Sequence, residues 1–216
     1  MGVTLPAAGR RLAVLASGAG SNLHAILDAC AAGTVAAEVV LVVTNRPDSG
    51  ALDKAARAGV RAVTLVPLGE EARADYDARL AQVVAAADPD HVVLAGWMRI
   101  LTMAFLGRFP GRVINLHPAL PGELPGTHAI ERAHREARAG ERTRTGVMVH
   151  LVPDEGVDDG PVLATAQVPI EPDDTLEELT ARVHAAEHRL LVDTLAALCD
   201  GSHPTTLSPL TTEAST

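Results

Sequence analysis

Apolar residues along this chain follow two patterns: short continuous runs, and longer segments with apolar positions three or four residues apart. The runs, rich in Val, Leu and Ile, predict buried strands, and the spaced segments predict helices that cover them. Up to His117 the two patterns alternate strictly, which is typical of a doubly wound, parallel sheet. The predicted strands of this part are 11–17, 37–45, 62–66, 90–96 and 111–117, and the predicted helices are 21–33, 49–59, 70–87 and 102–109.

After His117 the order of elements changes. Two apolar runs, 143–152 and 160–170, follow one another with only an acidic loop between them, so we expect an antiparallel addition to the sheet. A predicted helix over 127–140 precedes them, and a long amphipathic helix over 175–201 follows. The predicted fold class is therefore α/β, with a mainly parallel sheet, an antiparallel addition in the C-terminal half and helices on both faces.

We expect a single domain over residues 11–201, because no segment rich in Pro, Gly or Ser divides it. Residues 1–10 are predicted to be an N-terminal extension. Residues 202–216 are rich in Ser, Thr and Pro and are predicted to be a flexible tail.

Composition narrows the class of protein. The 216 residues are 47% hydrophobic and 21% charged, as in a globular protein, and the net charge of −9 disfavours a nucleic-acid surface. No apolar run approaches the roughly 18 residues that a membrane helix needs, and the run after Arg10-Arg11 is too short for an export signal. Cys30 and Cys199 are expected to be free thiols. We therefore predict a cytoplasmic protein.

A glycine-rich turn, Ser17–Asn22, joins the first strand to the first helix, with Ser21 or Asn22 as the expected N-cap. Its backbone N–H groups and the helix dipole form an anion cradle. Two glycines match the dinucleotide fingerprint, but Leu23 stands where the third belongs, and Asn45 replaces the ribose-binding acid. The turn also lacks the lysine of a P-loop. A site for one phosphate group and a purely structural turn remain about equally favoured.

Asn115 and His117 stand two residues apart at the end of a predicted strand, so their side chains share one side. An amide N–H can donate to a developing oxyanion, and an imidazolium can donate or transfer a proton. Pro118 fixes the chain direction after them. The acidic loop 153–161 supplies carboxylates that would keep the imidazole protonated. The alternative is that His117 only caps a loop.

Other histidines and motifs give little support for metal or hydrolase chemistry. His184 and His188 are four residues apart on the last predicted helix, but Ala185 stands where the zinc-protease motif needs glutamate. No G-x-S-x-G elbow is present, which disfavours a serine hydrolase. His150 lies on a predicted strand, and a core role and a role beside the site are equally open. No metal site is predicted.

Four motifs occur in order: Gly18–Leu23, Ala95–Leu101, Asn115–Pro118, and Thr145–His150 followed by Asp158–Pro161. Together they resemble the phosphoribosylglycinamide formyltransferase family of purine biosynthesis over almost the whole predicted domain. The resemblance implies a formyltransferase fold. It also implies transfer of a formyl group from 10-formyltetrahydrofolate to the amine of glycinamide ribonucleotide, without a metal. A monomer and a homodimer both remain open.

The resemblance further implies the roles of individual residues. Asn115 and His117 would stabilise a tetrahedral oxyanion, and Asp158 would assist proton transfer. Residues 11–117 would be the phosphate-binding, Rossmann-like half, and residues 118–201 the folate and catalytic-loop half. The substrate phosphate and ribose are expected at Gly20, Ser21, Asn22, Leu23, His184 and Glu187. The folate is expected at Arg73, Met98, Arg99, Ile100, Leu101, Asn115, Pro153, Asp154 and Asp158.

Two loops depart from the family's usual pattern. The loop Leu120–Gly126 carries its first proline one place early, which leaves its path open. The acidic loop is one residue longer than in some members, which leaves Asp158 and Asp159 as alternatives; the D-x-G-P pattern favours Asp158.

Other functions remain as alternatives. A formyltransferase that acts on an amino sugar nucleotide or a related amine would share these motifs. Methionyl-tRNA formyltransferase shares the core, but it usually adds a C-terminal domain and a basic surface, whereas this chain is acidic. Formyl-folate hydrolase usually adds an N-terminal domain. A phosphate- or nucleotide-binding module without catalysis is the alternative from another class.

Overall fold

The computed structural model describes residues 9–201. The predicted tail, and all but the end of the predicted N-terminal extension, lie outside the described residues. The strands are β1 (Arg10–Leu15), β2 (Ala37–Thr44), β3 (Ala62–Thr64), β4 (His91–Leu94), β5 (Val113–His117), β6 (Arg144–Leu151) and β7 (Val162–Pro169). The helices are α1 (Ser21–Ala31), α2 (Ala51–Arg57), α3 (Arg73–Ala85), α4 (Met103–Leu106), α5 (Ala129–Arg138) and α6 (Leu176–Cys199).

The seven strands form one sheet in the order β3-β2-β1-β4-β5-β6-β7. The first five strands pair in parallel, β6 pairs antiparallel with β5, and β7 pairs antiparallel with β6. This confirms the predicted fold class. The register of the antiparallel addition places His150 opposite Asn115 and Met148 opposite His117. A histidine of the second half of the chain is thereby brought beside the Asn-His pair of the first.

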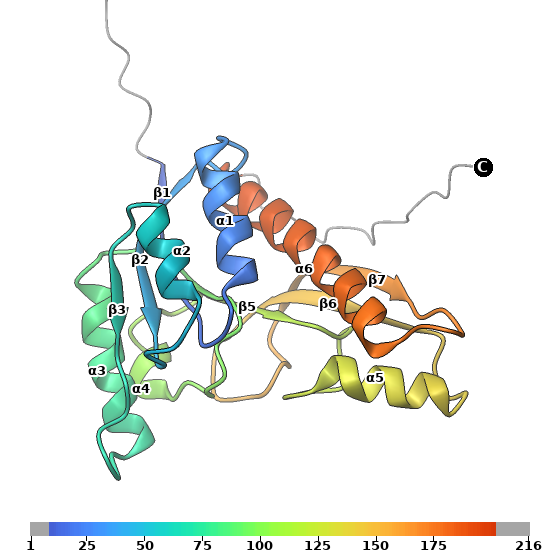
Figure 1. Ribbon diagram of the computed structural model, residues 1–216. Coiled ribbons are helices and arrows are strands. Elements are labelled where there is room, and N and C mark those ends of the chain that lie inside the picture. Colours follow the sequence, from blue (N-terminus) through green and yellow to red (C-terminus); the bar gives the residue numbers. More distant parts are fainter. Residues whose placement is uncertain (1–8, 202–216) are drawn as a thin grey trace, which may run out of the picture.

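Helices cover both faces of the sheet, as predicted (Figure 1). On one face, α1, α2, α5 and α6 pack on a core of Leu, Val, Ile and Ala side chains. On the other, α3 and α4 enclose a second core around Tyr76 and Phe105. Four of the parallel strands, β1, β2, β4 and β5, are largely buried on both faces, which explains their continuous apolar runs, whereas β3 lies at the edge of the sheet and is more exposed. Within residues 9–201, no helix is long and apolar enough to cross a membrane.

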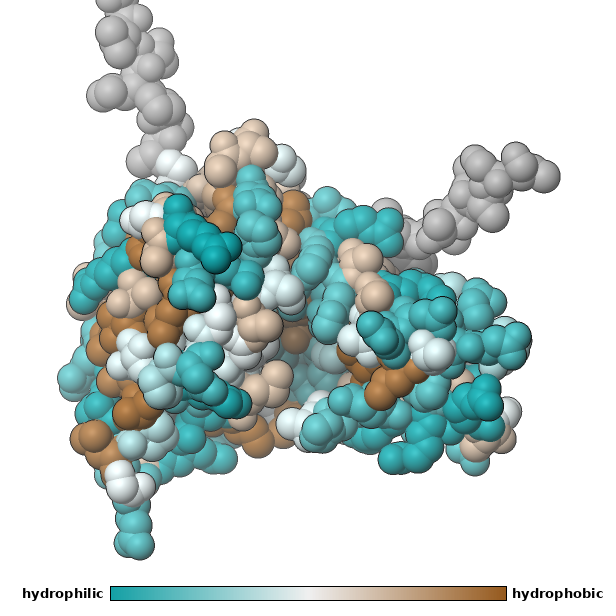
Figure 2. Space-filling view, viewed as in Figure 1, coloured by the Kyte–Doolittle hydropathy of each residue, from teal (hydrophilic) through white to brown (hydrophobic). Residues whose placement is uncertain are grey.

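The order of the strands reverses between β1 and β4, because β1 connects to β2 on one side while β4 and β5 lie on the other. Open α/β sheets bind ligands outside the carboxyl ends of their strands at such a point. The glycine turn follows β1, and the segment from Ala95 to Leu101 follows β4. In Figure 2 the surface is hollowed between the two halves of the molecule, where the cavity described below opens.

Candidate active site

Helix α1 begins at the glycine turn without help from a side chain. Its N-cap is Gly20, in the left-handed conformation with φ of 75°, and no side chain caps it among the described residues. The predicted caps, Ser21 and Asn22, are therefore wrong: both lie inside the helix. Only glycine adopts this conformation at no steric cost, and it leaves the first-turn N–H groups without capping partners. These N–H groups remain as donors for a ligand.

Two side chains, one just before helix α2 and one within it, fix the orientation of the peptides in the glycine turn. The Ser49 hydroxyl donates to the carbonyl of Gly18 at 2.8 Å, and the Lys54 ammonium donates to the carbonyl of Ala19 at 2.8 Å. The C=O and N–H groups of a trans peptide point in opposite directions. The amides of Ala19 and Gly20 therefore point away from α2, and both residues line the cavity. This arrangement suits a phosphate group.

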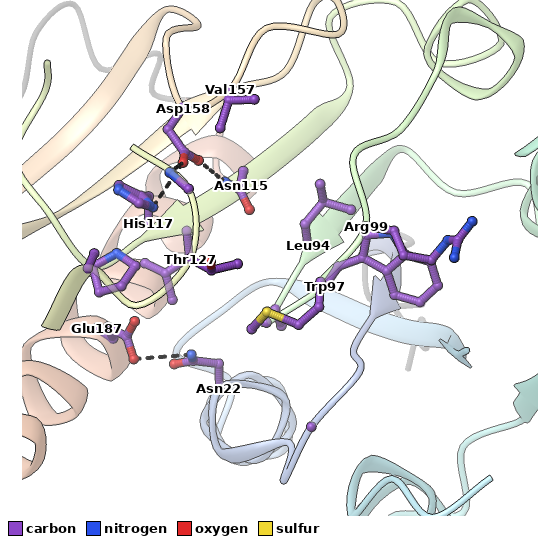
Figure 3. Close-up of a pocket in the computed structure, with 18 of the residues that line it drawn as sticks. Asn22, Leu94, Trp97, Arg99, Asn115, His117, Thr127, Val157, Asp158 and Glu187 are labelled. Atoms are coloured by element: carbon purple, nitrogen blue, oxygen red, sulfur yellow. Dashed lines mark hydrogen bonds and ion pairs between the residues drawn. The ribbon is translucent and has the colours of Figure 1, made fainter. Parts of the chain in front are cut away.

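Glu187 of α6 closes this end of the cavity opposite α1 (Figure 3). It is 6% exposed, and the Asn22 amide donates to its carboxylate at 3.4 Å. Burial raises the pKa of Glu187 to about 7, although the bond from Asn22 opposes this. The Nε2 atom of His184 lies 4.0 Å from the carboxylate. Within residues 9–201, no three His, Cys, Asp or Glu side chains are grouped as a metal site.

The segment after β4 forms a second wall of the cavity. Its Met98 amide donates to the Ser17 hydroxyl at 3.0 Å, which ties this wall to the glycine turn. The guanidinium of Arg99 lies over the Tyr76 ring, 4.5 Å from its centroid. The buried Tyr76 is fixed in turn by its hydroxyl, which donates to the Leu65 carbonyl at 2.7 Å. Helix α3, which begins at Arg73, thus also supplies the Tyr76 ring on which the Arg99 guanidinium rests.

Asn115, His117 and Asp158 meet at the other end of the cavity (Figure 3). The Asn115 amide donates to Asp158 Oδ1 at 3.1 Å, and His117 Nδ1 lies 3.2 Å from Asp158 Oδ2. The Gly126 amide donates to the same Oδ2 at 2.8 Å. Asp158 follows Asn115 by 43 residues and lies in the loop between β6 and β7, yet its carboxylate contacts both residues of β5. Asp158 therefore occupies this position, and Asp159 does not.

His150 is part of this group, and the sequence alone left its role open. It is 2% exposed and lies across β5 and β6 from Asn115, with its Nε2 atom 3.1 Å from the Asn115 amide nitrogen. Its Nδ1 atom lies 2.9 Å from the Leu151 carbonyl. The proton therefore belongs on Nδ1, and Nε2 accepts from Asn115. Its Nε2 atom is 3.6 Å from Asp158, which is too long for a hydrogen bond.

The charges of the cluster depend on burial and on close partners. Burial lowers the pKa of His117, which is opposed by the Asp158 carboxylate and by the Leu124 carbonyl, 3.1 Å from Nε2. Both ring nitrogens thus face acceptors, an arrangement that the imidazolium satisfies fully. Burial would raise the pKa of Asp158, but the Gly126 amide and the nearby imidazoles outweigh it, so this pKa lies below its usual value. The carboxylate is therefore ionised, and it opposes the loss of the His117 proton that burial favours.

The two ends belong to one cavity of about 720 Å³, a volume typical of small-molecule sites. It offers backbone donors for an anion at one end and side-chain donors with an acid and base pair at the other. Thirteen of the sixteen predicted site residues line it. They are Gly20, Ser21, Asn22, Met98, Arg99, Ile100, Leu101, Asn115, His117, Asp154, Asp158, His184 and Glu187.

Three predicted residues do not line the cavity. The side chain of Leu23 is buried in the core below α1, and Pro153 lies beside the cavity wall. Arg73 is held outside by Glu155, at 2.8 Å between Nη2 and Oε2. The other oxygen of Glu155 accepts from the Met103 amide at 3.1 Å, so this carboxylate ties the acidic loop to α3 and α4.

Comparison with known proteins places this geometry in a family. The model of the family described as Formyl transferase matches residues 10–195. The chain belongs to the formyl transferase family. The phosphoribosylglycinamide formyltransferase of Mycobacterium tuberculosis is 45% identical over 193 residues, which cover 89% of this chain and 86% of that protein.

Two further proteins are similar to this chain. The trifunctional purine biosynthetic protein adenosine-3 of Drosophila melanogaster is 42% identical over 195 residues, 89% of this chain, although this chain spans only 14% of that protein's length. The crystal structure of glycinamide ribonucleotide transformylase 1 from Symbiobacterium toebii superposes with a TM-score of 0.85 at 36% identity, covering 93% of this chain and 92% of that one.

Proposed function

We propose that this chain transfers the formyl group of 10-formyltetrahydrofolate to the amine of 5-phosphoribosylglycinamide, a step of purine biosynthesis. The observation that carries the proposal is the shape of the cavity: an anion cradle of backbone amides lies at one end, and Asn115, His117 and Asp158 lie at the other. The phosphate and the reacting amine of a ribonucleotide would occupy these two ends at once.

The chemistry begins when the glycinamide amine attacks the formyl carbon and a C–N bond forms. The carbonyl oxygen becomes an oxyanion, which accepts hydrogen bonds from Asn115 and His117. In the structure both donors are held within the cluster, Asn115 by Asp158 and His150, and His117 by Asp158 and Leu124. Each donor gives up one of these bonds to the oxyanion. Because the oxyanion only replaces an acceptor within the cluster, the two donors are already oriented before the reaction begins.

The intermediate collapses when the bond between the formyl carbon and N10 of the folate breaks. A proton must leave the attacking amine, and another must reach N10. Asp158, ionised and 3.2 Å from His117 Nδ1, holds the imidazolium and accepts or relays the amine proton. The net products are the formylated ribonucleotide and tetrahydrofolate. No covalent enzyme intermediate is required.

The binding roles follow the position of each residue. The turn residues Gly20 to Asn22 hold the phosphate, and His184 and Glu187 face the ribose. Met98 to Leu101 and Asp154 face the pterin of the folate. The glutamate of the folate pairs with Arg73, and to reach it this carboxylate must displace Glu155. The enzyme is proposed to work in the cytoplasm as a monomer or homodimer. Light scattering on the purified protein distinguishes the monomer from the homodimer.

The decisive experiment is a formyl-transfer assay with both substrates, in which mass spectrometry detects the formylated ribonucleotide and tetrahydrofolate. We expect turnover that depends on both substrates. An amino sugar nucleotide in place of the ribonucleotide serves as the comparison, and faster transfer to it would favour the alternative acceptor. If the wild-type chain transfers formyl to neither amine, the proposed function is wrong.

A further inference from the structure

The loop 118–126, which connects β5 to α5, has an unusual corner. Pro121 and Gly122 occupy the central positions of a four-residue turn, with Gly122 at φ of 76° and the Glu123 amide donating to the Leu120 carbonyl at 3.0 Å. Proline followed by a residue with positive φ is the signature of a type II turn. The early proline, which departs from the family's usual pattern, therefore makes a defined corner, and the chain leaves this corner at Glu123.

Glu123 is then held mainly by Arg142, and the Arg144 guanidinium lies further away, 3.9 Å from the Glu123 carboxylate. Arg142, which precedes β6, donates through Nη1 to the Glu123 carboxylate and through Nε to Glu136 of α5, the latter at 2.8 Å. The Arg142 side chain is 18% exposed and that of Glu123 is 28% exposed, so the pair is screened less than one at the open surface. We refer to Glu123 and Arg142 as the clamp.

The residues that follow the clamp reach the candidate catalytic cluster through their backbone. Leu124 has φ of 47°, a conformation that a leucine keeps only where its surroundings enforce it. Its side chain is buried, and its carbonyl lies 3.1 Å from His117 Nε2. Two residues later, the Gly126 amide donates to Asp158 at 2.8 Å. One short stretch of loop thus contacts both members of the His-Asp pair.

The start and the end of this stretch are fixed by different contacts. The Pro121-Gly122 turn sets the direction of the loop, and Arg132 donates to the Pro125 carbonyl at 2.8 Å near its end. Between these two points, the bond from Arg142 to Glu123 is the side-chain contact next to the strained Leu124. Removing this bond would allow Leu124 to relax and would withdraw its carbonyl from the imidazole.

We propose that Glu123 and Arg142 are positioning residues for formyl transfer. The clamp holds the loop so that the Leu124 carbonyl and the Gly126 amide keep the His-Asp pair in place. Neither clamp residue touches the cavity, so both act through the backbone of the loop. The inference rests on the proposed roles of His117 and Asp158. It adds that two residues outside the cavity keep this loop, whose sequence is atypical, in contact with both of them.

The test compares two conservative substitutions on the same arginine. Glu123→Gln removes the carboxylate on the loop, and Glu136→Gln removes the carboxylate on α5, whose side chain has a similar exposure of 29%. Because small displacements of a reacting group are costly, we expect Glu123→Gln to lower kcat about 10- to 100-fold while KM for either substrate changes less than about threefold. We expect Glu136→Gln to keep kcat within about twofold of the wild type.

A second measurement does not depend on activity. Nuclear magnetic resonance of nitrogen-15-labelled histidine rings follows the titration of His117 in each variant. The Leu124 carbonyl favours the protonated ring, so its withdrawal in Glu123→Gln should lower the pKa of His117, whereas Glu136→Gln should leave it unchanged. If the wild type transfers no formyl group, the proposed function fails, but this titration still tests the clamp.

Three results would overturn the proposal: a wild-type kcat in Glu123→Gln, an unchanged titration of His117 in that variant, or an equal loss in Glu136→Gln. Circular dichroism shows whether each variant folds. If Glu123→Gln does not fold, Arg142→Lys takes its place, since lysine keeps the charge but loses the forked geometry. It should show the same loss of kcat with unchanged KM, and retention of kcat would equally overturn the proposal.

Discussion

The two ends of the cavity are built in different ways. At the proposed phosphate-binding end, called the phosphate end, consecutive backbone amides at the start of α1 are available as donors. Ser49, just before α2, and Lys54 of α2 orient these peptides. At the proposed catalytic end, called the catalytic end, side chains from β5, β6 and the acidic loop hold one another through a shared carboxylate, Asp158. One end is a local structure and the other is assembled from distant segments.

This difference predicts how each end fails. A backbone cradle has no side chain to delete, so it is damaged only by a substitution that moves the main chain. A side-chain cluster loses its function when one member changes, even if the fold is unaltered, because the remaining polar groups are left buried without partners. The experiments below test this contrast, in order of decreasing expected effect.

The largest effect is expected for Asp158→Asn at the catalytic end. The amide cannot hold the imidazolium or take a proton, so kcat should fall about 10²- to 10⁴-fold, the usual contribution of acid–base catalysis. The pKa of His117 should fall further, because the carboxylate is the charge that opposes the effect of burial. Steady-state kinetics and histidine nuclear magnetic resonance measure the two changes.

The neighbouring carboxylate provides the control for that experiment. Asp159→Asn makes the same chemical change one residue away, outside the hydrogen-bonded cluster, and should leave kcat within about threefold of wild type. An equal loss in both variants would mean that the net charge of the loop, and not the contact with His117, supports catalysis.

The next effect is expected at the phosphate end, for Gly20→Ala. The residue has φ of 75°, and a Cβ atom there would lie 2.9 Å from the Cα atom of Ala51, so the turn must shift. Strain of this kind costs about 1–3 kcal/mol, and we expect KM for the ribonucleotide to rise about 10-fold with a smaller change in kcat. Thermal unfolding and kinetics measure the two effects.

Gly18→Ala is the matched control in the same turn, since a Cβ atom at this position meets nothing within 4 Å. Its KM and unfolding temperature should stay close to those of the wild type. If both alanine variants bind the ribonucleotide normally, the turn serves only the fold, and the contrast between the two ends is lost.

The same contrast explains what the sequence could predict. The sheet was predicted correctly because strands buried on both faces leave continuous apolar runs, and the antiparallel addition followed from two such runs without a helix between them. The first residue of α1 was predicted correctly, but its N-cap was wrong: Ser21 and Asn22 have good capping side chains, but the left-handed Gly20 places both inside the helix. Capping propensity gives no sign of such a turn.

The catalytic end was harder to predict because its contacts are long-range. Asn115 and His117 are two residues apart on a strand, so the sequence alone shows that their side chains lie on the same face. The place of His150 depends on the register between β5 and β6, which no local pattern records. The bond between Asn22 and Glu187 joins residues 165 positions apart, and only resemblance to a family assigned them to one end of the cavity.

A third experiment uses pH at the phosphate end. Because burial raises the pKa of Glu187 to about 7 from a usual 4.5, the folded protein binds more protons than the unfolded chain between these values. The contribution of this group to stability is therefore present below about pH 4.5 and is lost as the pH rises to about 7. Glu187→Gln should remove this loss. Urea unfolding should show similar stability for both proteins at pH 4.5 and a more stable variant at pH 8; equal stability at pH 8 would contradict it.

The smallest effect is expected at the cavity mouth, where the Arg73–Glu155 pair is 48% and 42% exposed and belongs to neither end. An exposed ion pair contributes about 0.2–1 kcal/mol, so Glu155→Gln should hardly change the unfolding temperature. It also frees Arg73 for the folate glutamate, so KM for 10-formyltetrahydrofolate should fall about two- to threefold, which corresponds to the same free energy.

A formyl donor that lacks the glutamate distinguishes competition from a general effect: its KM should be the same in both proteins. An equal fall for the two donors would mean that Glu155 acts on the acidic loop, and through it on Asp158, instead of competing for Arg73.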